Sequence, residues 1–541
     1  MLAFRTRLRA GPVTWQALAG GLASLVVAVA LYSRFSIHIL MTRDEGIYTY
    51  SGQQMAHGVA PYASIFDPKG PMAGVVAGLA AMVARGLGQD DIYAIRLAFF
   101  GCAVLAVLAV YLLVTRLFRS ALGGLTAAVV FAANWPFAVD ALAGPNAKTP
   151  AVLFAVLSMW LLTRRKWFWG AVLACLTVLV WQPMVIYVLV ALALPPLVAG
   201  GQRLRAFLQA VAGVAVPVVA VSVYFALAGA FDDFVAATLL FPLLGVRRSA
   251  ETVGARLLHI RDTIDRYYGF GGLLFWVGLA LLLVCVVVCV AVPLLRGRSS
   301  WRAALLSPLV AVVLVTLLGN AAYAVTDFQS YHDLYPFLPY PAIGIGGAVA
   351  LLVARLRARA VRRVGAVAVL AALVLLTGLS WVSFGNDPVN THRPGLRAQL
   401  ADGCALDRLR APGTPLLSLG DPVPLVTTHS RNPDRFIYLG SGVDHWKVDH
   451  TPGGFAGWRA QIRRWSPSVI VLRSWGGPYR PRMVRWLQQS GYLRRYVGVW
   501  AVFVTPDTVG RARQQGVVMT LRATKVVRGP GGSRLPVRNC G

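Results

Sequence analysis

Long apolar runs constrain the fold of this chain most strongly. About eleven runs, nearly free of charge, approach or reach the roughly 17 to 25 residues that a helix needs to cross a hydrocarbon core of about 30 Å. They cover residues 15–34, 96–115, 121–137, 149–163, 167–181, 183–199, 207–230, 271–294, 303–319, 335–353 and 364–384. Only 13% of the residues are charged and 57% are hydrophobic, whereas soluble proteins are about 25% charged. The sequence therefore predicts a polytopic α-helical membrane protein.

The placement of charge predicts the orientation in the membrane. Basic clusters fall on alternate loops, as at Arg116 and Arg119, Arg164 to Lys166, and Arg203 and Arg205. Lys and Arg next to spans mark the cytoplasmic side, and every Asp and Glu before residue 386 lies on the opposite loops. The net charge of +31 is thus explained by topology rather than by nucleic-acid binding. We expect a cytoplasmic N-terminus and an extracytoplasmic C-terminus.

The chain divides by composition into three parts. Residues 1–385 form the membrane domain, and residues 386–510 alternate short apolar runs with an amphipathic helix, "RMVRWLQQSGYLRRY", which predicts an extracytoplasmic α/β domain. Residues 511–541 are basic and rich in Gly, Pro and Arg, so we expect this tail to be partly disordered. Cys404 and Cys540 lie outside the spans, where a disulfide between them can form.

The first outer loop concentrates polar chemistry in a chain that has few acids. The stretch "MTRDEGIYTYSGQQMAHGVAPYASIFDPKGP" holds Asp44, Glu45, Asp67 and Lys69. A carboxylate near the membrane surface can act as a general base. A lysine held in the stiff turn "DPKGP" suits a phosphate. Two structural interpretations remain open: the acids cap the helix that follows, and Lys69 extends toward lipid headgroups.

Two later outer loops supply further candidates. Arg247 and Arg248 are unusual on the acidic side and suit an anion, with anionic lipid as the competing partner. His332 and Asp333 precede the tenth span and can relay a proton or hold a phosphate, although a lone loop histidine is more often a surface residue. The sequence contains no metal-ligand cluster, P-loop or nucleotide-binding glycine pattern in a strand-to-helix context, so neither a metal nor a nucleotide is indicated.

These elements together resemble the GT-C superfamily of polyprenyl-phosphate-dependent membrane glycosyltransferases, which includes protein O-mannosyltransferases and the lipid A aminoarabinose transferase. By this resemblance, Asp44 is similar to the catalytic acid of the first outer loop, Glu45 to its partner and Lys69 to the lysine that approaches the donor phosphate. "QSYHDLYPFLPY" resembles the family's His-Tyr element. "VWQPM", around Gln182, resembles a stretch that often has Lys where this chain has Trp181, so Arg247 or Arg248 would substitute.

The resemblance and the residues predict a bacterial plasma-membrane enzyme that transfers a sugar, such as mannose or arabinofuranose, from polyprenyl phosphate to an envelope glycan, glycolipid or protein with inversion. Two alternatives remain open. A flippase for lipid-linked sugars would place ionisable groups near the bilayer midplane, and the polar groups here cluster at one surface. A membrane-anchored binding protein would use the basic outer part, which carries 23 Lys plus Arg against 8 Asp from residue 386 onward.

Overall fold

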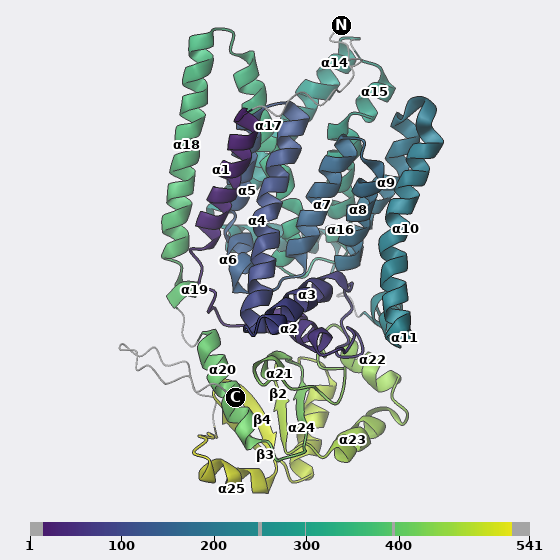
Figure 1. Cartoon of the computed structure of the whole chain (residues 1–541), viewed down its shortest axis with the longest axis vertical. Helices are drawn as coiled ribbons and strands as arrows, with labels where there is room; N and C mark the ends of the chain where they lie inside the picture. Colours follow the sequence, from purple (N-terminus) through teal and green to yellow (C-terminus); the bar gives the residue numbers. More distant parts are fainter. Residues whose placement is uncertain (1–14, 247–250, 298, 392–394, 522–541) are drawn as a thin grey trace.

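The computed structural model describes residues 15–246, 251–297, 299–391 and 395–521, which form a long helical bundle with a smaller α/β domain at one end (Figure 1). In the described part of the chain, seven helical segments are long and apolar enough to cross a membrane, and a bent pair makes an eighth. The seven are α1 (Trp15–Tyr32), α4 (Asp91–Phe118), η2–α10 (Gly200–Leu227), α13–α14 (Phe270–Leu295), η5–α16 (Leu309–Thr326), η6–α17 (Tyr331–Arg355) and α18 (Arg359–Gly385).

Each of the eleven predicted spans overlaps helices of the bundle, although the run 303–319 crosses the break between α15 (Trp301–Leu305) and η5–α16. Seven are the long helices, and the eighth is the pair α5 (Ala121–Ala132) and α6 (Trp135–Ala143), which bends by 70° at the break. The remaining three, α7 (Lys148–Thr163), α8 (Trp167–Val180) and η1–α9 (Gln182–Val198), are apolar but shorter than 18 residues. α6, which follows this break, carries the buried Asp140 of the candidate site described below.

Close helix contacts in the bundle depend on glycine. A Cβ on Gly346 of α17 would lie 2.4 Å from the carbonyl oxygen of Gly123 on α5, and a Cβ on Gly344 would collide with the carbonyl oxygen of Gly278 on α13. Apolar side chains gain little from meeting each other instead of lipid, so small residues that allow close backbone approach are the usual helix contacts in membranes. These contacts hold α17 between α5 and α13.

The first outer loop lies across the end of the bundle, next to the α/β domain (Figure 1). It contains α2 (Arg43–Ala56) and α3 (Met72–Gly86), which pack against each other. α3 consists of the apolar stretch "MAGVVAGLAAMVARG", and it runs across the bundle axis (Figure 1). A second outer segment contains α11 (Phe231–Val235), η3 (Ala236–Gly245) and α12 (Val253–Tyr268).

The α/β domain, which we call the outer domain after its predicted location, is built on a four-stranded sheet of order β1-β2-β4-β3. β1 and β2 are parallel, with Leu416 opposite Val469, and the other neighbours are antiparallel. The strands are β1 (Leu416–Leu419), β2 (Val469–Leu472), β3 (Leu493–Val497) and β4 (Trp500–Val504). The helices are α19 (Pro388–Thr391), α20 (Leu396–Leu409), α21 (Val423–Thr427), α22 (Val443–Asp449), α23 (Gly454–Trp465), α24 (Tyr479–Gln489) and α25 (Pro506–Gln514).

The outer domain is fastened directly to the first outer loop. The Gln399 side chain exchanges two hydrogen bonds with the backbone of Met41, at 2.7 and 2.9 Å. The Phe66 amide donates to the carbonyl oxygen of Arg435 at 2.8 Å, and the Phe66 ring stacks on Phe436 with centroids 4.9 Å apart. The first outer loop, which carries the candidate residues, is therefore held between the helical bundle and the outer domain.

Candidate active site

The candidate acids lie in the first turn of α2, and the local sequence explains why the helix begins there. Thr42 is the N-cap: its hydroxyl accepts a hydrogen bond from the Glu45 amide, and the Glu45 carboxylate accepts one from the Thr42 amide at 3.0 Å. This reciprocal capping box satisfies two amides that a helix start leaves unpaired. Asp44 lies between these residues and takes no part in the cap.

Glu45 points inward and is held by its surroundings. Its side chain is 12% exposed, and its Oε2 lies 3.9 Å from Nη2 of the fully buried Arg96. The carboxylate also packs against Gly144, where an added Cβ would come within 2.7 Å of it. Burial raises the pKa of Glu45 to about 7, although Arg96 acts in the opposite direction. These contacts indicate that Glu45 positions the α2 terminus, as the capping interpretation predicts.

The Glu45→Gln variant tests this role through the pH dependence of stability. A folded-state pKa of about 7, above the ordinary 4.5, gives stability that is present below pH 4.5 and lost as the pH rises through 7. This loss amounts to about 3 kcal/mol. Glutamine keeps the capping hydrogen bond but does not titrate, so we expect the thermal midpoint of the variant to fall less than that of the wild type between pH 4.5 and 8. Identical pH dependence of the two midpoints would contradict the role.

Asp44 points outward and is accessible. Its side chain is 54% exposed, and its Oδ1 accepts a hydrogen bond from Nε of Arg43 at 3.0 Å. Partial burial favours the neutral carboxyl, but Lys69 and Arg43 outweigh it and, with a smaller contribution from His332, hold the pKa of Asp44 below its usual range. Asp44 is therefore an ionised and accessible carboxylate at neutral pH.

The "DPKG" turn, which carries Asp67 and Lys69, is held rigidly by hydrogen bonds. The Lys69 amide donates to Oδ1 of Asp67 at 3.1 Å, and the Tyr62 hydroxyl donates to the Lys69 carbonyl oxygen at 2.8 Å. Nε2 of Gln182 donates to the carbonyl oxygen of Pro68 at 3.0 Å and to that of Thr238 at 3.2 Å. Gln182 therefore supports the turn from the bundle. Its connection to the candidate site runs through the backbone of the turn.

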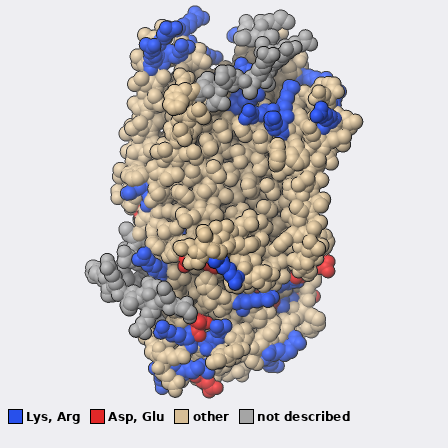
Figure 2. Space-filling model, viewed as in Figure 1, with Lys and Arg blue, Asp and Glu red and all other residues tan. Residues whose placement is uncertain are grey.

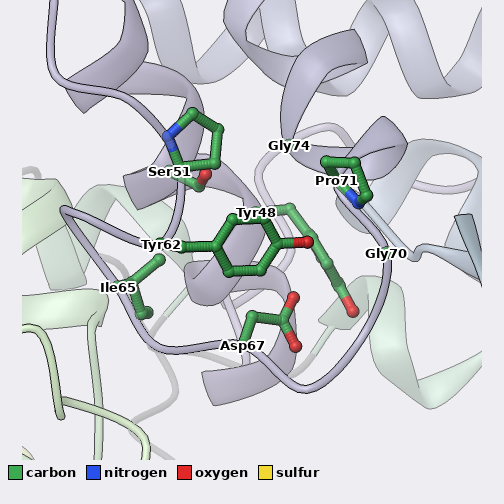
Figure 3. Close-up of a pocket in the computed structure, with 9 residues that line it drawn as sticks. Tyr48, Ser51, Tyr62, Ile65, Asp67, Gly70, Pro71 and Gly74 are labelled. Carbon is green, nitrogen blue, oxygen red and sulfur yellow. The ribbon is translucent and has the colours of Figure 1, made fainter. Parts of the chain in front are cut away.

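A small pocket lies on the inner side of this turn. Tyr48 and Ser51 line it from α2, Asp67 and Gly70 from the turn, and Gly74 from α3 (Figure 3). Burial raises the pKa of the Asp67 carboxyl, and Lys69 offsets only part of this effect. Asp67 is thus a structural part of the turn that holds the Lys69 backbone.

A Gly70→Ala substitution should disturb the turn. The added Cβ would lie 2.0 Å from the carbonyl oxygen of Leu179 on α8, a backbone atom that cannot move aside cheaply. We expect a loss of about 1–3 kcal/mol of stability. Gly86→Ala, at the end of α3, is the matched control, since nothing lies within 4 Å of its added Cβ. Thermal midpoints measure the effect, and equal midpoints of the two variants would contradict the prediction.

Lys69 presents a cation whose charge acts on Asp44. Its Nζ donates to the Tyr48 hydroxyl at 2.9 Å and lies 5.6 Å from the centroid of the Tyr48 ring. Burial opposes the charged form, but Tyr48, Asp44 and Asp67 outweigh it, so the pKa of Lys69 lies above its ordinary value. Lys69 therefore keeps a full positive charge at any physiological pH.

Lys148 is a second buried cation, which the sequence analysis missed. It is 7% exposed at the start of α7 and forms an ion pair with Asp333, which is 6% exposed. Its Nζ lies 4.8 Å from the centroid of the Trp181 ring, and the charges of Lys69 and Asp44 act on it. The structure thus places a cation against Trp181, where the resemblance leads one to expect a lysine.

Asp140 is the other residue that the sequence analysis missed. Its Oδ2 accepts hydrogen bonds from the Tyr335 hydroxyl at 2.7 Å and from Nδ2 of Asn146 at 2.9 Å, and it lies 3.1 Å from Nε2 of His332. His332 therefore faces Asp140, whereas Asp333 faces Lys148, so the two sequence neighbours have different partners.

Three sequence predictions concern, wholly or in part, residues outside the described ranges. Arg247, Arg248 and Cys540 lie outside the described residues, and so does most of the predicted tail, although Thr520 forms an isolated bridge with Tyr496. Within the described ranges, no group of three or more His, Cys, Asp or Glu side chains is arranged to hold a metal ion.

Comparisons with known proteins identify the fold. No protein-family model matches the chain, and no curated protein matches it either. ArnT from Cupriavidus metallidurans in the apo state aligns with a TM-score of 0.55 and 17% identity over 89% of this chain and 97% of ArnT. The same ArnT bound to undecaprenyl phosphate gives 0.56 and 16% over 91% and 98%.

A second solved protein extends the comparison. The apo oligosaccharyltransferase from Archaeoglobus fulgidus aligns with a TM-score of 0.54 and 15% identity over 84% of this chain and 69% of its own. ArnT and the oligosaccharyltransferase are both GT-C superfamily proteins. At these identities the likeness establishes the fold, so the GT-C-like fold predicted from the sequence is confirmed.

Proposed function

We propose that this chain, which has the fold of the GT-C membrane glycosyltransferases, transfers a sugar from a polyprenyl-phosphate donor to an extracytoplasmic acceptor with inversion. One observation carries the proposal: Asp44 is an exposed, ionised carboxylate, and its pKa is lowered by the charge of Lys69, a lysine fixed in a rigid turn. A base and a phosphate-binding cation are the two groups that this chemistry needs.

Asp44 acts as the general base in this mechanism. Its carboxylate takes the proton of the acceptor hydroxyl as the acceptor oxygen bonds to the anomeric carbon, and the bond from that carbon to the phosphate oxygen breaks. The electron pair of the broken bond leaves with the polyprenyl phosphate. The lowered pKa of Asp44 keeps its carboxylate ionised, so that it is free to accept a proton. Arg43 donates a hydrogen bond to Oδ1 and orients the carboxylate.

Lys69 and Lys148 stabilise the leaving group. The donor phosphate is a diester with one negative charge, and it becomes a monoester with up to two as the sugar departs. Cations fixed beside it interact more strongly with the departing group than with the donor, which lowers the barrier. Lys148 takes the role for which the sequence analysis suggested Arg247 or Arg248, and its partner Asp333 balances its charge before the donor binds.

The acceptor reaches Asp44 at the junction with the outer domain. Nη1 of Arg43 donates to the carbonyl oxygen of Ser474 at 3.1 Å, and the Arg43 guanidinium lies 4.9 Å from the centroid of the Tyr438 ring. Arg43 thus joins the base to the outer domain, and the exposed side of Asp44 opens beside this connection. The outer domain is therefore placed to select the acceptor.

The charge distribution supports the proposed orientation in a bacterial plasma membrane, with residues 1–385 as the catalytic membrane domain and residues 386–510 outside the cell. Basic residues gather at the end of the bundle away from the outer domain, and the acidic residues in view lie at the outer-domain end (Figure 2). This is the asymmetry that positive-inside insertion produces. The N-terminus is then cytoplasmic, and the donor reaches the site through the bilayer.

The proposal is tested with purified full-length protein in liposomes. Polyprenyl-phosphate mannose, arabinofuranose and aminoarabinose are supplied with an envelope fraction as acceptor, and release of free polyprenyl phosphate is measured. We expect release that depends on the acceptor for one of these donors. A glycan and glycolipid profile of a strain lacking the protein then identifies the acceptor.

A transporter of lipid-linked sugars would give a different result. If sugar-lipid crosses the membrane of sealed vesicles while no glycosidic bond forms, the protein is a transporter of lipid-linked sugars and the roles given to Asp44 and Lys69 are wrong. Both quantities, movement of the sugar-lipid across the membrane and release of polyprenyl phosphate, are therefore measured in the same sealed liposomes.

A further inference from the structure

A long stretch of the outer domain lacks acidic residues altogether. From Thr451 to Pro506 the sequence contains nine arginines and neither Asp nor Glu. The whole chain has 52 basic and 21 acidic residues, a ratio at which nine arginines would be accompanied by about four acids. An excess of one sign on a folded domain attracts partners of the opposite sign.

Six of these arginines lie on the adjacent helices α23 and α24. They are Arg459, Arg463 and Arg464 on α23, and Arg480, Arg482 and Arg485 on α24. Five are exposed and Arg459 is half-buried. Among the described residues, no carboxylate lies within ion-pairing distance of any of the six. Their charge is thus left for an external partner.

Aromatic rings hold several of these arginines in place. Phe455 and Tyr479 stack with centroids 5.6 Å apart, and the Arg482 guanidinium lies 4.9 Å from the first ring and 5.5 Å from the second. Arg459 lies 5.4 Å from Phe455, and Arg463 lies 5.6 Å from the ring of Trp486. A guanidinium stacked on a ring keeps its N–H donors in a fixed plane, so less entropy is lost when it binds an anion.

We propose that this Arg–aromatic face, formed by the six arginines of α23 and α24 around Phe455 and Tyr479, binds a polyanionic glycan whose sugars carry carboxylate or phosphodiester groups. Arginine recognises both anions with paired hydrogen bonds, and the two partly exposed rings offer apolar faces to sugar rings. The proposal does not depend on the glycosyl-transfer chemistry, because none of these residues touches the candidate active site.

The position of the face favours a glycan over lipid headgroups. α23 and α24 lie beyond α21 and α22, on the part of the outer domain remote from the helical bundle (Figure 1). In the proposed orientation, the bundle crosses the bilayer and this face lies away from it. A polymer in the space around the outer domain does reach it, and binding there would hold the domain close to a supply of glycan.

Binding of full-length protein to polygalacturonate, with neutral dextran as the comparison, tests the proposal. We expect binding to polygalacturonate that weakens as salt is raised and no binding to dextran. The double variant Arg463→Gln/Arg482→Gln should lose about tenfold or more in affinity. The matched control is Arg494→Gln/Arg495→Gln, which removes the same charge from β3 outside the face and should change affinity less than about twofold.

Two further measurements complete the test. Phe455→Ala, checked for folding by its thermal midpoint, should weaken glycan binding without a change in charge. Equal losses in the two double variants would show that only net charge matters, and the proposal would then be wrong. Binding to anionic phospholipid vesicles that depends on Arg463 and Arg482, without binding to polygalacturonate, would overturn it in favour of a membrane surface.

Discussion

The Asp44→Asn variant is expected to lose on the order of 10³-fold in kcat, because a positioned general base contributes about 10²- to 10⁴-fold. Asparagine has the same shape but does not accept the acceptor's proton. The side chain is 54% exposed and lies outside the capping box, so the thermal midpoint should change little. The measurement is the initial rate of polyprenyl-phosphate release under saturating donor.

Asp262→Asn is the matched control for this variant, since it makes the same chemical change at an exposed aspartate of α12. We expect it to keep the wild-type rate. The pH profile adds a second readout. Lys69 and Arg43 lower the pKa of Asp44. The wild-type rate should therefore stay constant down to about pH 4, the ordinary pKa of an aspartate, and should fall only at lower pH. Wild-type turnover by folded Asp44→Asn protein would remove Asp44 from the mechanism.

Sequence patterns predicted those features that depend on local residues. Each apolar run overlaps a helix of the bundle, and "TPLLSLG", "PSVIVLRS" and "VGVWAVFVTP" contain β1, β2 and β4. By contrast, "RMVRWLQQSGYLRRY", predicted as one helix, contains the second part of α24 and most of β3. Hydropathy and alternation act over neighbouring residues, so tertiary context seldom overrides them in long runs. The "DPKG" turn was also readable, because Pro and Gly restrict the backbone wherever they occur.

The partners of the site residues depended on tertiary structure and were not predicted. Lys148 directly precedes the predicted span 149–163, where a lysine suggests a flanking residue, and only the fold places it against Asp333 and Trp181. Asp140 fell just beyond a predicted span, and the bend of 70° between α5 and α6 directs it toward His332. The one available signal was Trp181 itself, an aromatic residue at the position where the resemblance leads one to expect a cation.

The Lys148→Met variant should lose both stability and activity. Removal of the ammonium leaves the buried Asp333 carboxylate without its charge partner, and breaking a buried ion pair in this way costs about 3–5 kcal/mol. We also expect on the order of 10²-fold lower kcat in the protein that remains folded, because the departing phosphate loses one stabilising cation. Thermal midpoints and single-turnover rates measure the two effects. Lys166→Met, which removes an exposed lysine directly before α8, should change neither.

The double variant Lys148→Met/Asp333→Asn separates the structural role of Lys148 from the catalytic one. Asparagine can still accept the hydrogen bonds that Oδ2 of Asp333 receives from the Gln329 and Ser330 amides, and no buried charge is left unpaired. Stability should therefore return to near the wild-type value while kcat stays low, since the cation is still absent. If kcat recovers together with stability, Lys148 only holds the fold, and Lys69 then stabilises the leaving phosphate without help from this position.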